Sequence, residues 1–513
     1  MGSSFLGFDI ATRSLDIARG NMGIINNNIT NANTPGYSRQ LAIQEATKPM
    51  YSGDGKGMQG TGAAIVGIER QRDSYIDYKY WNANSKNGEY AVKQTQIGQI
   101  ETLIKEPSEG GFEDSINNFF DAMQKASTNP ADKSVRSSLM QESISLTKYF
   151  NSTAEELKAQ QKELNFSIKT KVEEINSIAN QIQSLNGQIL KMEVSGDMAN
   201  DLRDQRDMLI DKLSGIINTS VDYRTNNGVE ECIVRINNQV LVDNISVNEL
   251  TVETRAANKN DSDVDNLYDI KWKNGLAFNM YDDNMTGELR GYIDARDGNN
   301  SDVGYKGIPH YMEQLNNFAR TFAMAINEGK HLDGTRIEGI ESGHIDGYGQ
   351  NDTTGNYLFS YRDTDGTPIG KSSGPLDYTK ITAENFSLSA EVMDSQENIS
   401  LSNEDGNTSN NEIAEQINLL RNNASVFKEG KIMDYMNAVM SEAAIDVNQA
   451  KRVTNSQANV LKTITNQRLS VSGVDINEEM MNLMKFQNAY SASAKVLQVL
   501  NEIYNITING IGL

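Results

Sequence analysis

The sequence predicts an α+β multidomain protein in which the terminal helices pair as a coiled coil, an elongated helical stalk follows, and two β-rich domains are inserted into the stalk. Three observations lead to this fold class. Apolar residues repeat at heptad spacing at both ends of the chain, helical periodicity extends over residues 133–192, and apolar residues alternate with polar ones within residues 219–297 and 331–407. A chain of 513 residues also exceeds what a single hydrophobic core usually serves.

The N-terminal segment carries an apolar stripe with the three-and-four spacing of coiled-coil a and d positions. The helix that carries it is expected to end near Asn31, because the residue before Pro35 is pushed out of the helical region. Pro35 and Gly36 then fit the centre of a type II turn, in which the glycine has a positive φ angle. The stripe consists of Phe8, Ala11, Leu15, Ala18, Met22, Ile25 and Ile29.

Asparagine side chains are dense around this helix end. Asn28, Asn31 and Asn33 can satisfy backbone groups that the helix leaves open, and a contact with a neighbouring subunit is compatible with that role. After the turn, Tyr37 begins an alternation of apolar and polar residues that is typical of a strand. Residues 37–70 are therefore expected to form a β-hairpin arm.

The middle of the chain contains several helical patterns. The longest, over residues 133–192, would extend roughly 90 Å at ~1.5 Å per residue, so an elongated stalk is expected. Asn186 and Gly187 mark a point where this helix could kink or break. Shorter helical patterns cover residues 84–106, 113–128, 308–328, 410–423 and 429–468.

Two segments with a period of two are expected to form inserted domains, a first β domain at 219–297 and a second β-rich region at 331–407. In the first, Cys232, Val234 and Ile236 alternate as the inner face of a strand does. Cys232 is the one cysteine of the chain, so no intrachain disulfide can form. We expect it to be a small buried side chain rather than a reactive thiol.

The C-terminal segment carries a second heptad stripe, which Gln487 and Asn501 interrupt at one of its two positions. Asp475 can cap the helix, and Glu478 three residues later can complete a capping box. The stripe consists of Met480, Leu483, Tyr490, Ala494, Leu497, Tyr504 and Ile508.

The order of these patterns is helices, strands, one helix, strands and helices. It indicates β domains inserted into a helical stalk whose two ends lie together. The predicted parts are a terminal coiled-coil domain (1–32 with 475–513), a helical stalk domain that includes the hairpin arm (33–218 with 298–330 and 408–474), the first inserted β domain (219–297) and the second inserted β-rich region (331–407).

The two terminal stripes are weak as a structure on their own. Seven apolar side chains, two of them alanines, bury too little surface to order about thirty residues of backbone, and an isolated helix of this kind is marginal in water. Pairing the two termini helps, but polar residues interrupt the second stripe. We therefore expect the stripes to form an assembly seam, which becomes fully ordered only among neighbouring copies of the chain.

The composition argues against several classes of function. The net charge is −22 without a long basic run, so nucleic acid is not an expected partner. No apolar segment is long enough to insert into a membrane, and the N-terminus lacks the pattern of a cleaved secretory signal. The three histidines, His310, His331 and His344, have no metal-binding spacing, so no metal, cofactor or catalytic site is expected. The charges at 203–207, RDQRD, predict a solvated or interhelix ion-pair face.

Both ends of the chain carry motifs of a known family. Residues 27–40, NNITNANTPGYSRQ, resemble the N-terminal motif of the axial proteins of the bacterial flagellum, which are the rod, hook and hook-associated proteins. Residues 472–504, SGVDINEEMMNLMKFQNAYSASAKVLQVLNEIY, are similar to the other half of that signature. The positions that carry the first motif are Asn28, Asn31, Asn33, Pro35, Gly36 and Tyr37.

The resemblance implies a structural subunit of the bacterial flagellum, of the hook-associated type, which assembles at the distal end of the hook and joins hook to filament through its terminal helices. It implies self-association in a ring-like or helical assembly. The implied partners are the hook protein, hook-associated protein 3 and a flagellar export chaperone. It also implies export through the flagellar type III apparatus without a cleaved signal peptide, to a position outside the cell.

Two alternatives remain open. Another axial protein, of the hook or rod type, would share both motifs, although the chain length, the long helical stalk and the YSRQ ending of the first motif favour the hook-associated type. A secreted wall-active enzyme on an axial scaffold would need a carboxylate pair or a metal site within 225–297 or 331–407. The acidic residues there form no recognisable constellation, so no enzyme is expected.

Overall fold

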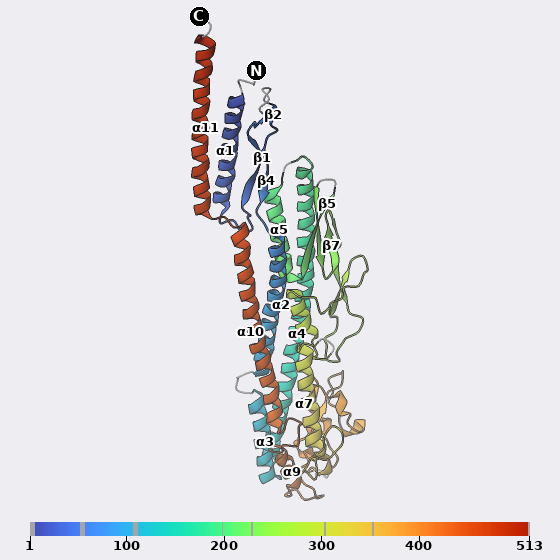
Figure 1. Cartoon of the computed structure of the whole chain (residues 1–513). Helices are drawn as coiled ribbons and strands as arrows, with labels where there is room; N and C mark the ends of the chain where they lie inside the picture. Colours follow the sequence, from blue (N-terminus) through green and yellow to red (C-terminus); the bar gives the residue numbers. More distant parts are fainter. Residues whose placement is uncertain are drawn as a thin grey trace.

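The computed structural model describes residues 6–51, 57–105, 111–196, 198–226, 229–301, 304–350 and 353–510. The molecule is elongated, and both chain ends lie at the same end of a long bundle of helices (Figure 1). The predicted α+β class is confirmed, because long helices run through the molecule and several small antiparallel sheets lie beside them. The first five and last three residues of the predicted terminal domain lie outside the described residues.

The terminal helices, α1 (Leu6–Asn31) and α11 (Ile476–Gly510), lie side by side with opposite chain directions (Figure 1). α1 ends at the predicted residue. The turn that follows has the predicted type II geometry, since Gly36 has a φ angle of +80° and the N–H of Tyr37 donates to the carbonyl of Thr34 at 3.2 Å.

The start of α11 is set by Asp475, which lies just before the first helical residue. Its carboxylate accepts hydrogen bonds from the N–H groups of Asn477 and Glu478, as an N-cap does. The Glu478 carboxylate, which was expected to complete a capping box, accepts a hydrogen bond from Arg39 at 2.7 Å. The beginning of α11 is thereby joined to the segment that follows α1.

The predicted hairpin arm lies alongside α1 (Figure 1). Its long strands, β1 (Gln40–Ala46) and β4 (Ala63–Arg70), pair antiparallel with one irregularity of register. Toward the tip, β2 (Met50–Tyr51) pairs with β3 (Met58–Gln59). Among the described elements, α1 therefore packs mainly against the arm and α11.

Three long helices form the stalk, namely α2 (Ser74–Lys105), α4 (Lys133–Glu193) and α10 (Ile432–Ser472). α10 lies along α2, and α4 runs beside them (Figure 1). α2 begins earlier than the helix predicted at 84–106, because the carboxylate of Asp73 caps its first N–H groups.

α4 is one continuous helix of 61 residues, so the break considered at Asn186 and Gly187 does not occur. Asn186 is buried, and its amide donates to the carbonyl of Asn244 at 2.8 Å and accepts from Arg206 at 3.2 Å. These tertiary contacts hold the helix where its local sequence favours an end.

The first insert packs a small β structure against α4 and the helix that leads into it, α5 (Asn200–Ile216). Cys232, Val234 and Ile236 are buried, which confirms the predicted inner face. A four-stranded antiparallel sheet in chain order is followed by a two-stranded hairpin. The strands are β5 (Thr219–Asn226), β6 (Val229–Ile236), β7 (Gln239–Asp243), β8 (Ser246–Val247), β9 (Leu250–Thr254) and β10 (Tyr268–Trp272).

The last part of the predicted first β domain is helical. Residues 288–297 form α6 (Glu288–Asp297), which packs against α2 and α4. Leu289 and Ile293, four positions apart, are both buried, and this spacing is helical rather than β. Gly291 permits the close approach to α2, because a β-carbon there would lie 2.8 Å from the carbonyl oxygen of Glu89.

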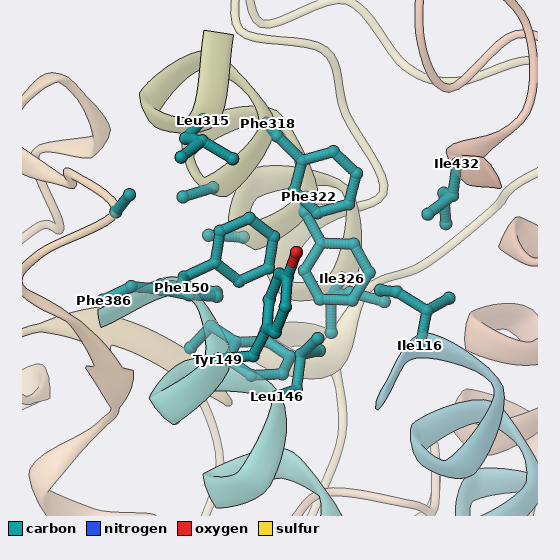
Figure 2. Packing of buried hydrophobic residues seen from close by; sticks show 14 of the residues in the cluster. Ile116, Leu146, Tyr149, Phe150, Leu315, Phe318, Phe322, Ile326, Phe386 and Ile432 are labelled. Carbon is teal, nitrogen blue, oxygen red and sulfur yellow. The ribbon is translucent and has the colours of Figure 1, made fainter. Parts of the chain in front are cut away.

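An aromatic core fills the end of the molecule opposite to the chain termini (Figure 2). α7 (Ile308–Glu328), which has the predicted limits, contributes Phe318, whose ring stacks on that of Phe150 with 5.1 Å between centroids. α3 (Phe112–Thr128) and α9 (Glu412–Leu420) close the same core.

The second insert holds less β structure than predicted. In the described part of 331–407, the strands are β11 (Phe359–Tyr361) and β12 (Phe386–Leu388), which pair antiparallel, and a short helix follows as α8 (Ala390–Asp394). The remaining chain forms turns and single helical turns. The apolar side chains of β11 and β12 pack on the helices of the aromatic core, so no second sheet is needed to bury them.

His344 is completely buried in the second insert. Its Nδ1 lies 2.7 Å from the carbonyl oxygen of Asn356, and its Nε2 accepts from the N–H of Ser400 at 2.8 Å. The ring is therefore neutral with the proton on Nδ1. Burial lowers the pKa of His344 to about 4, since the charged form has lost its hydration.

We predict that His344 makes the fold less stable in mild acid. The unfolded histidine has a pKa of about 6.5, so between that pH and about 4 the unfolded state binds a proton that the folded state does not. Stability should fall with pH across this window, by about 2 kcal/mol at pH 5. Urea unfolding of the second insert's core at pH 7 and pH 5 measures the difference.

The variant His344→Gln should have a lower stability at pH 7 but a smaller difference between the two pH values. His331→Gln, at a partly exposed position, serves as the control and should keep the full difference. Equal pH dependence in the two variants would contradict the assignment to His344.

Candidate functional site

α1 and α11 pack in a regular antiparallel register. The hydroxyls of Ser14 and Ser493 lie 2.8 Å apart, and the amide of Asn28 donates to the carboxylate of Glu479 at 3.1 Å. Asn28 and Ser14 are two heptads apart on α1, as are Glu479 and Ser493 on α11. The contact between the terminal helices therefore follows a heptad row on both.

α1 buries part of the predicted stripe, but the buried row is rotated about the helix axis. Asn21 and Asn28 are buried as well, whereas Phe8 is 38% exposed. The cause is the arm, a second partner that a two-helix seam does not include, and a β-carbon at Gly20 would lie 2.6 Å from Cδ1 of Ile65 in β4. Of the remaining stripe residues, Ala11, Ala18 and Ile25 are buried, and Leu15, Met22 and Ile29 are half-buried.

α11 buries almost none of its side chains. Of its 35 residues, Glu479 alone is buried, and this residue is charged. The apolar side chains of the helix are at best half-buried within one chain. Of the predicted stripe, Leu483, Leu497 and Tyr504 are half-buried, and Met480, Tyr490, Ala494 and Ile508 are exposed.

Seven exposed apolar residues of α11 fall on the side of the helix that points away from α1. At 3.6 residues per turn, they cover an arc of under half the circumference, opposite to Glu479 and Ser493. An apolar surface of this kind marks an interaction site. We call it the open face, and it consists of Met480, Met481, Met484, Val496, Val499, Ile503 and Ile506.

Asn28 joins α1 to the arm through a completely buried side chain. Its Oδ1 accepts from the N–H of Gln40 at 3.0 Å, and its Nδ2 donates to the carbonyl of Gln40 at 2.9 Å, as a neighbouring strand would. Oδ1 also accepts from the hydroxyl of Tyr37, and Nδ2 also donates to Glu479. Burial and nearby carboxylates raise the pKa of Tyr37, so its hydroxyl remains a donor. All four hydrogen-bonding positions of the amide are used.

Arg39 joins the arm to both C-terminal helices. Its guanidinium donates to Glu479 at 2.8 Å and to Glu478 at 2.7 Å. Its N–H donates to the carbonyl of Ser472, the last residue of α10. Arg39 therefore balances the charge of Glu479, which would otherwise be costly to bury.

The other residues of the N-terminal motif lie at the exposed turn. Asn31 donates to a carbonyl one turn earlier in its own helix, which is a local role, and Asn33 is exposed. Pro35 and Gly36 line a cavity of about 200 Å³ against Met208 of α5. The structure thus brings Asn28 and Tyr37 into the contact between the terminal helices and the arm, and leaves the rest of the motif at the surface.

A buried ion cluster holds the base of the arm on α5. Arg70, the last residue of β4, donates to Asp204 at 2.7 Å and to Asp207 at 2.8 Å. Arg72 donates to Asp207 at 2.8 Å and to Asp77 at 2.8 Å. Burial alone would raise the pKa of Asp207, but Arg72 and Arg70 hold it below its usual range, so the carboxylate stays ionised.

This cluster corrects part of the expectation for residues 203–207. Asp204 and Asp207 are buried rather than solvated, and their partners are Arg70 at the end of the arm and Arg72 just after it. The interhelix alternative holds for Arg203, whose guanidinium pairs with Glu193 of α4. Sequence reasoning missed Arg70 and Arg72, because partners more than a hundred residues away leave no periodic signal. A weak signal exists in the two acids, which are three positions apart and so share one face of α5.

The site offers packing surfaces rather than reactive groups. Within the ranges that the structure describes, no three His, Cys, Asp or Glu side chains are placed to hold a metal ion together. None of the described helices is long and apolar enough to cross a membrane. The features that stand out are the open face of α11 and the polar contacts that join both terminal helices to the arm.

We predict that Asn28→Ala weakens the attachment of α1 to the arm by about 2–4 kcal/mol, because it leaves the buried groups of Gln40 without partners. Hydrogen exchange at the amide of Gln40 should become faster. Asn31→Ala is the matched control, since Asn31 bonds within its own helix, and it should leave this amide unchanged. Equal effects of the two substitutions would refute a special role of Asn28.

Comparisons with known proteins relate two parts of the chain to families of flagellar proteins. Residues 97–344 match the family described as flagellar hook-associated protein FlgK helical domain, and residues 465–510 match the C-terminal family of the flagellar basal body rod FlgEFG proteins. The second match covers the end of α10 and most of α11.

Sequence similarity to other proteins extends over almost the whole chain. Flagellar hook-associated protein 1 of Bacillus subtilis is 28% identical over 100% of this chain and 99% of its own length. The protein of the same name from Salmonella typhimurium is 26% identical over 97% of this chain and 98% of its own. The hook junction protein FlgK from Burkholderia pseudomallei shares the fold with a TM-score of 0.58 at 14% identity, over 77% of this chain and 100% of that one. These matches together support the assignment of the chain to the flagellar hook-associated proteins of the hook–filament junction type.

Proposed function

We propose that the chain is the subunit that assembles at the distal end of the flagellar hook and joins hook to filament through self-association of its terminal helices. The observation that carries the proposal is the open face of α11. Seven apolar side chains along one helix are left half exposed or more by the described part of the chain, and complete burial of such a side chain contributes about 1.5–3 kcal/mol. Neighbouring copies, stacked around a common axis, supply such partners from their own terminal helices.

The partners follow from the family and are part of the proposal. The subunit contacts other copies of itself in a ring-like or helical assembly, the hook protein on one side and hook-associated protein 3 on the other. An export chaperone covers it before export, which proceeds without a cleaved signal peptide and ends outside the cell. The chain acts as a building block and catalyses no reaction.

The division of the chain into parts suits this role. The terminal domain, 1–32 with 475–513, forms the contacts along the axis. The stalk, built from 33–218, 298–330 and 408–474, carries the inserts at 219–297 and 331–407 away from that axis. The elongated shape and the position of both termini at one end support this arrangement (Figure 1).

We predict that the double substitution Val499→Asn and Ile503→Asn abolishes junction formation without unfolding the chain. Both side chains are about half exposed, 53% and 51%, so the single chain loses little by the change. A strain without the protein should have hooks that bear no filaments and should release flagellin. Electron microscopy of this strain, supplied with the variant, should still show bare hooks.

Ile245→Asn provides the matched control, because Ile245 is 55% exposed but lies in the first insert. This variant should restore filaments, and both variants should melt at nearly the temperature of the unchanged chain. Filaments restored by the α11 variant would count against assembly through the open face. Filaments still attached in the strain without the protein would count against the junction role itself.

A further inference from the structure

The segment at residues 37–40, YSRQ, sends alternate side chains to two different parts of the molecule. The first and third residues reach the terminal helices. The hydroxyl of Tyr37 donates to Asn28 of α1 at 2.8 Å, and the guanidinium of Arg39 donates to Glu479 of α11 at 2.8 Å.

The second and fourth residues reach α5 on the stalk. Ser38 donates to both carboxylate oxygens of Asp204, through its N–H at 2.9 Å and its hydroxyl at 2.7 Å. The side-chain amide of Gln40 donates to Asp201 at 3.0 Å. Side chains of an extended segment point alternately to opposite sides, so four residues can bind the terminal helices on one side and α5 on the other.

Asp204 has a special place in this arrangement because it holds both long sides of the arm. One carboxylate oxygen accepts from the hydroxyl of Ser38, which precedes β1, and also from Arg70, which ends β4, at 2.7 Å each. The side chain of Asp204 is only 8% exposed. A buried carboxylate with three well-placed donors keeps one position, since any displacement leaves charge and donors uncompensated.

We propose that residues 37–40 form a two-sided coupler that fixes the direction of the terminal helices relative to the stalk, and that Asp204 is the positioning residue on its stalk side. The hydrogen bonds of Asp204 go to Ser38 and Arg70 rather than to a terminal helix. It sets the angle of the arm, and Asn28 and Glu479 transmit that angle to α1 and α11. The coupler is a property of the single chain and does not depend on self-association.

The test measures the angle between arm and stalk in the isolated full-length chain. Spin labels are attached to cysteines introduced at Glu45 in the arm and Glu173 on α4, both exposed. The native Cys232 does not compete for label, because it is completely buried. Double electron–electron resonance should give a narrow distance distribution in the unchanged chain and a shifted, broader one in Asp204→Asn, whose amide places a donor against the donors of Ser38 and Arg70.

Glu193→Gln is the matched control. The side chain of Glu193 is also 8% exposed and accepts two hydrogen bonds from an arginine, Arg203, but it joins α4 to α5 and does not bond to the arm. Both substitutions should lower the melting temperature, and only Asp204→Asn should change the distance distribution. Arg39→Gln, which cuts the other side of the coupler, should leave the arm–stalk distribution as it is.

A broad distribution in the unchanged chain, an unchanged one in Asp204→Asn, or equal broadening in Glu193→Gln would overturn the proposal. None of these outcomes bears on whether copies of the chain associate. Conversely, bare hooks in the assay of the α11 variant would say nothing about the coupler. The two proposals can therefore fail separately.

Discussion

The apolar surface that α11 leaves open is the constraint on which the rest of the molecule depends. A helix of 35 residues that buries a single side chain, and that side chain a carboxylate, lacks the tertiary packing from which helices in proteins derive most of their stability. α1 covers one side of it and the arm covers α1, so none of the described elements lies on the open face. A partner from outside the chain would cover this face, and the assembly proposed above provides one in a neighbouring copy.

In contrast to the exposed apolar side chains of α11, the polar side chains of Asn28 and Glu479 are buried within the chain. At the base of the terminal helices, Asn28, Arg39 and Glu479 satisfy one another, and Asp204 and Arg70 hold the arm on α5. Buried groups with complete sets of partners favour one geometry, because partial sets are costly. Buried charged and amide groups therefore lie at the base of the terminal helices, whereas exposed apolar groups lie along α11. New contacts on the open face can form without breaking any of these hydrogen bonds and ion pairs.

Local chemistry was predictable from the sequence, and contacts between distant segments were not. The turn at Gly36 and the limits of the helix at 308–328 depend on neighbouring residues, and they are found as predicted. The helix at 288–297 and the burial of Asp204 and Asp207 depend on partners far along the chain, so periodicity alone did not indicate them. The terminal stripes show both effects. Their heptad spacing is real, but the arm turns the buried row of α1 toward Asn28, which a two-helix pattern could not indicate.

Hydrogen exchange of the dilute, unassembled chain tests the central claim most directly. The amides of α11 from about residue 484 to 510 lie beyond the contacts of Glu478 and Glu479 with Arg39. They are compared with the amides of α4, which has buried side chains along its whole length. If the open face requires a partner, the α11 amides exchange much faster than those of α4 in the single chain and become protected only when copies assemble. Protection of α11 equal to that of α4 in the dilute chain would contradict the claim that this helix is completed by its neighbours.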